Sequence, residues 1–253
     1  MTTTHNTTCL ACGSDNLLMV LDLDKQPLAN AFIDNLQEDE EQYPLAVNLC
    51  KNCYHLQLTH SVDPDLIYKN YLYVSGTSRT YLDYMDWYAL FVKEQMKYWP
   101  MTVLDIGCND GSQLDAFKRL GLQTYGVDPA ENLHPISSAK GHTVVCGFWD
   151  QNTQAELGNQ EFDIITSQNA FAHIPDPLSY LKLVSQSLRP DGRMFISTSQ
   201  ANMILNDEFD TIYHEHISFF NIKSMQALAR RAGLYLVDVV KTPIHGVSYI
   251  FVL

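Results

Sequence analysis

A cluster of side chains that can move protons lies in the stretch FDTIYHEHISFF, where Tyr213, His214, Glu215 and His216 are consecutive. Burying any one of these groups without a partner costs about 2 kcal/mol or more. In a core strand with no other role, these side chains would therefore only destabilise the fold. Histidine titrates near neutral pH, and a neighbouring carboxylate can fix its tautomer. The run therefore indicates a site for acid–base chemistry. A second metal site is the alternative interpretation, although adjacent positions of a strand point to opposite faces.

Four of the six cysteines form two Cys-x-x-Cys pairs, Cys9 with Cys12 and Cys50 with Cys53. Four thiolates can surround one Zn²⁺ tetrahedrally and hold together a segment that has little core of its own. Because all four ligands come from the protein, we expect the metal to be structural. The alternative is two unrelated pairs of buried or redox-active thiols. The 37 residues between the pairs exceed the usual ribbon spacing and predict an insert.

A glycine-rich loop follows a short apolar strand predicted at Thr102–Ile106. Glycine is needed there because the backbone must turn sharply and approach a ligand closely. A dinucleotide would call for the spacing G-x-G-x-x-G. Here an acid precedes the first glycine, and its carboxylate suits a ligand that carries an ammonium and a sulfonium group. The pattern resembles the loop of class I S-adenosylmethionine-dependent methyltransferases. A glycine turn in another α/β protein is the alternative. The pattern consists of Asp105, Gly107, Asn109 and Gly111.

Three later side chains can bind the same ligand. Asp128 ends the second strand, and its carboxylate can accept hydrogen bonds from both hydroxyls of a ribose. Phe148 follows the third strand and can flank an adenine. Asn169 follows the fourth strand, at the carboxyl end where open parallel sheets bind their ligands.

The elements that must position these side chains alternate between strand and helix, as expected for an α/β fold. Apolar periodicity predicts strands at 102–106, 123–127, 142–146, 162–167, 193–198, 234–241 and 247–253, and helices at 81–98, 112–120, 178–188 and 224–232.

The composition of the chain limits its function. Its 253 residues, 46% of them hydrophobic and 18% charged, can bury a large core without disulfide bonds. The net charge of −13, with only 16 Lys and Arg residues, disfavours nucleic acid as a partner. The first residues do not resemble a signal peptide, and no apolar run approaches the roughly 20 residues that cross a membrane. We therefore expect a cytoplasmic protein without a membrane partner.

Eight motifs together identify a family. They are CLACG at 9–13, QPLAN at 26–30, YLYVSGTS at 71–78, DIGCNDGS at 105–112, GVDPA at 126–130, AHIPD at 172–176, YHEH at 213–216 and HGVS at 245–248. The chain resembles the zinc-containing sugar C-methyltransferases, which transfer a methyl group to carbon 3 of a nucleotide-linked 4-keto deoxysugar. The resemblance covers nearly the whole chain. The chain lacks the further C-terminal α/β domain that the family usually has. Its HGVS motif stands where the family tends to carry two glycines.

The resemblance also implies roles for individual residues. His216 would be the base that removes the proton next to the ketone, with Glu215 and Tyr213 supporting it or orienting the sugar. His173 would stabilise the enolate oxygen or hold the ketone. Tyr73 would face the sugar from the N-terminal side.

Other residues near these motifs have simpler interpretations. His214 occupies a variable position in the family motif, so we expect it at the surface. A lone histidine after a strand is often only a hydrogen-bonded core residue, which is the alternative for His173. Tyr71 and Tyr73 can be packing residues. Arg79 is a cation that could reach a diphosphate.

We therefore predict an α/β protein with two parts, a zinc-binding module at 1–68 and a class I methyltransferase domain with a Rossmann-like sheet at 69–253. Its predicted function is methyl transfer from S-adenosylmethionine to carbon 3 of a dTDP-type 4-keto deoxysugar, after His-assisted enolate formation. The cofactors are S-adenosylmethionine and a structural Zn²⁺, and we expect a monomer. Two alternatives stay open: an O- or N-methyltransferase of another small metabolite, and a protein that binds S-adenosylmethionine and zinc without chemistry.

Overall fold

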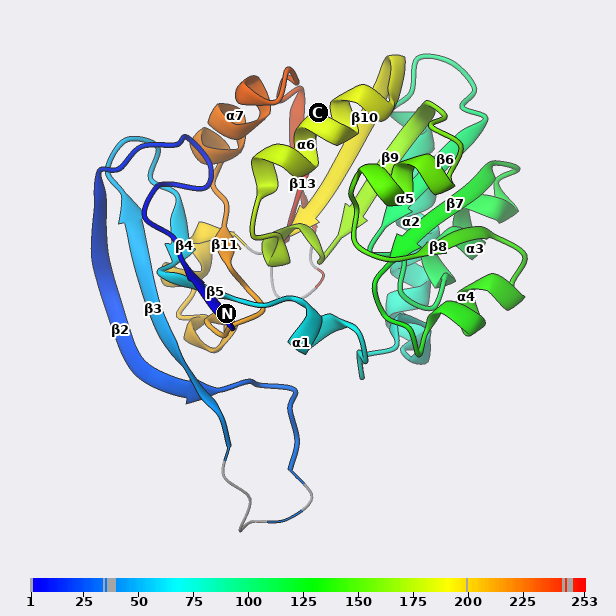
Figure 1. Cartoon of the computed structure of the whole chain (residues 1–253). Coiled ribbons are helices and arrows are strands. Elements are labelled where there is room, and N and C mark those ends of the chain that lie inside the picture. The colour runs from blue at the N-terminus through cyan, green and yellow to red at the C-terminus, as the bar shows by residue number, and fades with distance from the viewer. Residues whose placement is uncertain (1, 34, 36–39, 199, 243, 245–247) are drawn as a thin grey trace.

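A sheet of seven strands forms the centre of the larger part of the chain (Figure 1). The structure is a computed structural model, and it describes residues 2–33, 35, 40–198, 200–242, 244 and 248–253. The strand order is β12-β13-β10-β9-β6-β7-β8; the pairs from β10 to β8 are parallel, whereas β13 runs antiparallel to β10 and β12. The strands are β6 (Thr102–Ile106), β7 (Gln123–Asp128), β8 (Thr143–Cys146), β9 (Phe162–Gln168), β10 (Leu188–Thr198), β12 (Asp238–Thr242) and β13 (Ser248–Val252).

Helices cover both faces of this sheet, which explains why its central strand β6 is buried along its whole length. Leu104 and Ile106 of β6 pack into the cluster that contains α6 and α7, while Val103 packs toward α2 and α3. The helices are α2 (Arg79–Glu94), α3 (Ser112–Arg119), α4 (His134–Ala139), α5 (Gln151–Glu156), α6 (Pro177–Ser187) and α7 (Ile222–Arg231). Among the described residues, no helix has the length and apolar character needed to cross a bilayer.

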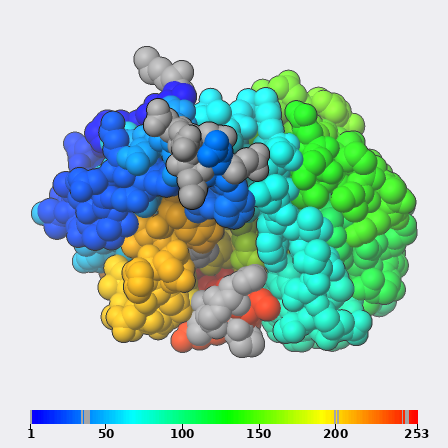
Figure 2. Space-filling view, turned by 90° about the horizontal axis from the view of Figure 1, so that it is seen from below, coloured from blue at the N-terminus to red at the C-terminus, as the bar shows by residue number. Residues whose placement is uncertain are grey.

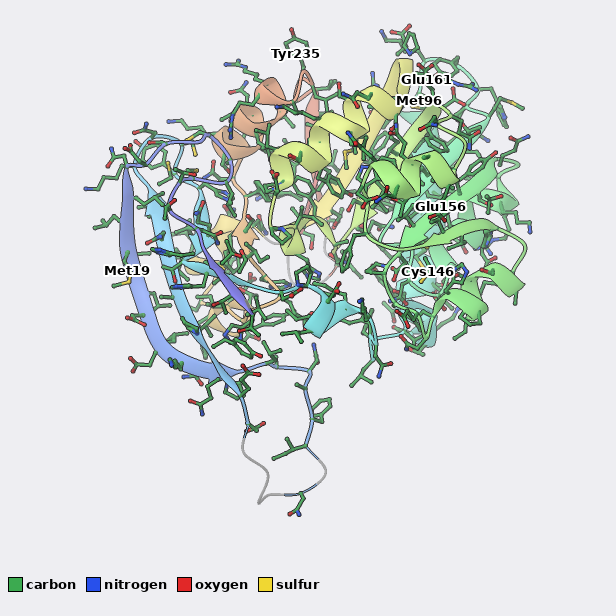
Figure 3. All side chains as sticks on the ribbon, viewed as in Figure 1. Met19, Met96, Cys146, Glu156, Glu161 and Tyr235 are labelled. Carbon is green, nitrogen blue, oxygen red and sulfur yellow. The ribbon has the colours of Figure 1, made fainter. Side chains whose placement is uncertain are left out.

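The N-terminal part forms a separate, smaller sheet with the order β11-β4-β3-β2. Its elements are β2 (Leu17–Pro27), β3 (Gln42–Cys50), β4 (Leu56–Leu58) and β11 (Ser218–Phe219), while β1 (Thr3–His5) pairs with β5 (His60–Val62) and α1 spans Asp65–Tyr68. Strands β2 and β3 form a long hairpin (Figure 1), and Met19 points away from it into solvent (Figure 3).

Strand β11 joins the two parts of the chain, because it comes from the segment after β10 yet pairs with β4 of the small sheet. Phe219 and Met203 complete the apolar core of that sheet, packing against Leu45, Val47, Leu56 and Leu58. The contact therefore ties the residues around 213–220 to the cysteine-containing module. Four single turns of 3₁₀ helix, η1 (Ser75–Thr77), η2 (Phe171–His173), η3 (Ala201–Ile204) and η4 (Phe209–Thr211), lie in the connecting segments.

The predicted elements agree with the structure in kind and differ at their ends. Strand β10 begins at Leu188, five residues before the strand predicted at 193–198, because a register shift between Leu188 and Arg193 lets the strand bulge and continue. Asp191 takes a left-handed conformation in that bulge, and a Cβ at the neighbouring Gly192 would lie 2.8 Å from the Arg189 carbonyl oxygen, which is too close for a side chain. The last helix and strand boundaries shift by a few residues, as frayed ends do. His245 and Gly246 of the HGVS motif lie outside the described residues.

Candidate active site

A cavity of about 380 Å³ opens at the carboxyl edge of the large sheet. The strand order reverses between β6 and β9, and open α/β sheets bind their ligands at such a point. From below, the molecule is hollowed between the segment around residues 200–215 (gold) and the segment around residues 70–95 (cyan) (Figure 2). Nine of the predicted site residues line the cavity: Tyr73, Gly107, Asn109, Asp128, Phe148, Asn169, His173, Tyr213 and His216.

The carboxylate of Asp128 is fixed at one side of this cavity by two backbone amides. The N–H of Asn109 donates to Oδ2 at 2.7 Å, and the N–H of Ala130 donates to Oδ1 at 2.9 Å. Each oxygen keeps a further lone pair, so the group can accept hydrogen bonds from a diol. Burial raises the pKa of Asp128, and the two amides oppose that effect.

The glycine loop needs its glycines for two reasons. Gly107 and Gly111 have φ angles of +84° and +79°, which side chains rarely adopt. A Cβ at Gly107 would also lie 2.6 Å from the Cβ of Ala170, so the loop packs closely against the segment after β9. Gly111 caps α3 and does not line the cavity.

Asp105 lies beneath the loop, and its side chain does not line the cavity. Thr166 Oγ1 donates a hydrogen bond of 2.7 Å to Asp105 Oδ1. Burial raises the pKa of Asp105 to about 7, the Thr166 hydrogen bond opposes this, and the charge of Asp128 adds to it. The carboxyl group is therefore partly protonated near neutral pH.

Ionisation of Asp105 should lower the stability of the fold as pH rises. Its pKa is about 7 when folded and close to 4 when unfolded, so the folded state holds the proton more tightly, and stability is lost between these values as pH increases. The loss amounts to at most about 4 kcal/mol. We expect Asp105→Asn to reduce the fall in unfolding free energy between pH 5 and pH 8, measured by urea denaturation. An unchanged pH dependence would contradict this assignment.

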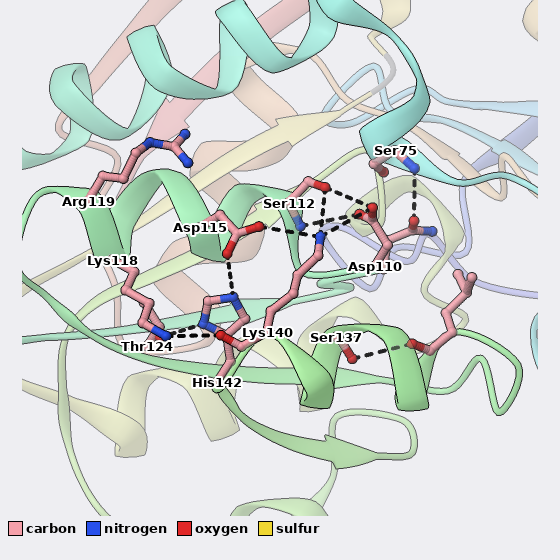
Figure 4. Close-up of polar contacts among 12 residues, drawn as sticks. Ser75, Asp110, Ser112, Asp115, Lys118, Arg119, Thr124, Ser137, Lys140 and His142 are labelled. Atoms are coloured by element: carbon pink, nitrogen blue, oxygen red, sulfur yellow. Dashed lines mark hydrogen bonds and ion pairs between the residues drawn. The ribbon is translucent and has the colours of Figure 1, made fainter.

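A network of charged side chains supports the loop from behind (Figure 4). Lys140 Nζ lies 3.0 Å from Ser112 Oγ and 3.4 Å from carboxylate oxygens of both Asp110 and Asp115. The imidazole of His142 contacts Asp115 at 3.1 Å. These contacts clamp the start of α3 to the segment between α4 and β8.

A strap, residues 69–77, lines the cavity beside the glycine loop and is held by the side chain of Asn109. Its amide oxygen accepts from the N–H of Ser75 at 2.9 Å, and its Nδ2 donates to the carbonyl of Tyr73 at 3.0 Å. A Cβ at Gly76 would lie 2.4 Å from Asp110 Oδ2, so the strap packs directly on the loop. The Asn109 side chain thus binds the strap.

The imidazole of His216 has a defined tautomer. Nδ1 lies 2.8 Å from the carbonyl oxygen of Thr211, which can only accept, so Nδ1 carries the proton. Nε2 then has the lone pair, and Tyr213 OH lies 3.1 Å from it. Burial lowers the pKa of His216 to about 4, although the Thr211 hydrogen bond opposes this. The ring is therefore neutral at pH 7, with a pKa below the near-neutral value expected from its residue type.

A second neutral imidazole lies beside the first. The rings of His173 and His216 stack with centroids 5.3 Å apart, and His173 also stacks on Tyr68 at 5.4 Å. Burial, with a smaller contribution from His216, lowers the pKa of His173 to about 3. The predicted pair of histidines is thus brought together from η2 and from the segment before β11.

Two residues of the YHEH run lie away from the cavity. The Glu215 side chain is 3% exposed and lines a second cavity of about 330 Å³. His214 is buried, not at the surface as we expected, because its Nε2 hydrogen-bonds to the carbonyl of Tyr43 at 3.1 Å. A variable position in a motif gives no information about such a long-range contact. Tyr68 and Tyr71, which were not predicted as site residues, also line the first cavity. The sequence feature that could have identified them is their close spacing to Tyr73, a predicted site residue.

The four predicted metal ligands converge. The Sγ atoms of Cys9, Cys12, Cys50 and Cys53 lie within 4.8 Å of one another. The Cys9–Cys53 and Cys12–Cys50 Sγ distances are both 3.6 Å, close to the roughly 3.8 Å between thiolates around a tetrahedral zinc ion. The donor set therefore fits Zn²⁺ and leaves no position for a substrate.

Comparison with known families agrees with both parts of the chain. Residues 79–239 match the family described as "Methyltransferase domain", and residues 9–68 match the one described as "Putative zinc binding domain". The chain belongs to the methyltransferase family. The predicted fold class is confirmed, as is a methyltransferase with a zinc-binding N-terminal part, and both families agree with the predicted cofactors, S-adenosylmethionine and zinc.

Individual methyltransferases show how far the similarity extends. The chain is 32% identical to the C-methyltransferase NovU of Streptomyces niveus, over 96% of this chain and 59% of that protein. It is 29% identical to the ubiquinone biosynthesis O-methyltransferase of Aeromonas salmonicida, over 58% of this chain and 66% of that protein. The chain therefore spans less than two thirds of either relative. The magnesium protoporphyrin IX methyltransferase of Synechocystis PCC 6803 shares the fold, with a TM-score of 0.52 and 14% identity over 68% of this chain and 81% of that one.

The fixed carboxylate of Asp128 gives a first test of the methyltransferase cavity. We expect Asp128→Asn to weaken binding of S-adenosylhomocysteine about 10- to 100-fold, because a charged acceptor for two hydroxyls is lost. Isothermal titration calorimetry measures the change. Asp238→Asn, which alters a carboxylate on the outer strand β12, is the matched control and should leave the affinity unchanged.

Proposed function

We propose that this methyltransferase forms a carbon–carbon bond at carbon 3 of a nucleotide-linked 4-keto deoxysugar. The observation that carries the proposal is the neutral imidazole of His216, which lines the same cavity as Asp128 and the glycine loop. This carbon becomes a nucleophile only after it loses a proton next to the ketone, so such a reaction needs an unprotonated base within the cavity, which for histidine is the neutral form. The similarity to NovU, a C-methyltransferase, supports the same assignment.

The side chains divide the chemistry between them. His216 Nε2 takes the proton from carbon 3, and the electron pair of the C–H bond moves onto the ketone oxygen as an enolate. A ring N–H of the neutral His173, or the hydroxyl of Tyr213, donates a hydrogen bond to that oxygen. Tyr73 faces the sugar from the strap. Asp128, Phe148, Asn169 and the glycine loop would hold S-adenosylmethionine, which supplies an electrophilic methyl group.

A proton-exchange experiment tests this function. The protein is incubated in deuterated water with S-adenosylhomocysteine and a panel of dTDP-4-keto-6-deoxysugars, and exchange at carbon 3 is followed by NMR. We expect exchange at carbon 3 in the presence of S-adenosylhomocysteine. When S-adenosylmethionine replaces S-adenosylhomocysteine, we expect a methylated sugar. Absence of both across the panel would reject the proposed substrate.

A second function is supported by the charge of the cavity. No lysine or arginine is among the described residues that line it, whereas Asp128 and Glu208 are. This favours an uncharged acceptor at the reacting end, and His216 could equally deprotonate a hydroxyl group. Turnover of a metabolite that has a hydroxyl and no ketone would support this O-methyltransferase alternative.

A further inference from the structure

The Glu215 carboxylate is buried, and its described partners are neutral donors from two different parts of the chain. Asn30 Nδ2, in the loop after β2, donates to Oε1, and Tyr71 OH, in the strap, donates to Oε2 at 3.1 Å. A buried carboxylate is costly unless donors satisfy it. The two contacts therefore link the zinc-binding module to the strap through Glu215.

Two tyrosines of the first cavity depend on Glu215. The hydroxyl of Tyr71 bonds to its carboxylate, and the hydroxyl of Tyr68 lies 3.4 Å from its backbone carbonyl. Tyr68 stacks on His173, which in turn stacks on His216. We call Tyr68 and Tyr71 the aromatic wall. A displacement of Glu215 would therefore move the aromatic wall and, through the stacked rings, the imidazoles of His173 and His216.

The backbone of Tyr71 is fixed as well. Asn132 Oδ1 accepts from the Tyr71 N–H at 3.0 Å, and Asn132 Nδ2 donates to the Tyr71 carbonyl at 2.9 Å. With its backbone anchored to the segment after β7, the direction of the Tyr71 ring depends on where its hydroxyl is held. That hydroxyl is held by Glu215.

We propose that Asn30 is a positioning residue for the reaction: it orients Glu215, which fixes the aromatic wall against His173 and His216. Asn30 acts from the zinc-binding module and lies outside the first cavity. The inference rests on the proposed function for its catalytic consequence, while the contact itself can be tested without turnover. Glu215 is then a positioning residue too, and its charge takes no part in proton transfer.

The test compares five variants in the carbon-3 exchange assay. Asn30→Ala and Tyr71→Phe should each lower kcat about 10- to 100-fold, and the double variant should lose no more than the stronger single one. Glu215→Gln still offers an oxygen to Tyr71, and its amide N–H can donate to the side-chain oxygen of Asn30 once the Asn30 amide turns over. This variant should keep most of the rate and the wild-type pH profile. Asn70→Ala changes an amide of the same strap that is not among the described hydrogen-bond partners of the Glu215 carboxylate, and should leave the rate unchanged.

Independent effects of Asn30→Ala and Tyr71→Phe, multiplying in the double variant, would overturn the proposal. So would a loss in Glu215→Gln as large as that in His216→Gln, since this would require the charge. Zinc content and S-adenosylhomocysteine affinity verify that each variant is folded. If the wild-type protein shows no exchange, the proposed function fails. In that case 3-fluorotyrosine at position 71 reports the contact between Tyr71 and Glu215 without turnover. Asn30→Ala should shift its ¹⁹F resonance, and an unchanged resonance would reject the positioning role.

Discussion

Replacing His216 with glutamine is expected to abolish carbon-3 exchange almost completely, by about 10²- to 10⁴-fold. Glutamine can still donate to the Thr211 carbonyl, but it has no lone-pair nitrogen to accept the proton that Nε2 would take. Affinity for S-adenosylhomocysteine should change little, because the residues that surround Asp128 are untouched. Exchange measured by NMR and affinity measured by calorimetry distinguish a lost base from a lost fold.

The pH dependence of exchange gives a second measure of the same group. Since the pKa of His216 is lowered to about 4, the ring is neutral above that pH and becomes protonated below it. The rate should therefore be flat from pH 8 to about pH 5 and fall at lower pH. His5→Gln, which alters a histidine on β1 that does not line the cavity, is the matched control. A variant at His216 that still exchanges at the wild-type rate would exclude it as the base.

The sequence predicts the parts of this site that depend on local pattern. The loop after β6 and the acid at the end of β7 follow from strand, glycine and helix signals within a few residues of one another. The zinc site is equally predictable, because zinc ligands often occur as Cys-x-x-Cys pairs and the sequence contains two of them.

Contacts between distant segments could not be predicted in this way. Glu215 and His216 are neighbours in the chain, yet one meets Asn30 in the zinc-binding module and the other meets His173 after β9. The depressed pKa of His216 depends on the burial that this packing creates. The pairing of β11 with β4 has no local signal either, since two residues form the strand.

Removing the zinc ion is expected to disable the reaction while leaving Asp128 and the glycine loop in place. Structural zinc can contribute on the order of 10 kcal/mol to the folding of a small module, so the small sheet should lose its order without it. Strand β11 is paired to that sheet, and the N–H of Leu58 donates to the Ile217 carbonyl at 2.8 Å, next to His216. The base would then lose its fixed position.

We expect Cys50→Ser with Cys53→Ser, or treatment with a chelator, to lower carbon-3 exchange at least about 100-fold. The affinity for S-adenosylhomocysteine should stay within about threefold, because Asp128 and the glycine loop belong to the large sheet. Limited proteolysis should show new cleavage between residues 209 and 220, which reports the release of β11 without relying on turnover. Cys146→Ser, outside the cluster, is the matched control. Full exchange by a zinc-free protein would show that β11 positions His216 without help from the metal.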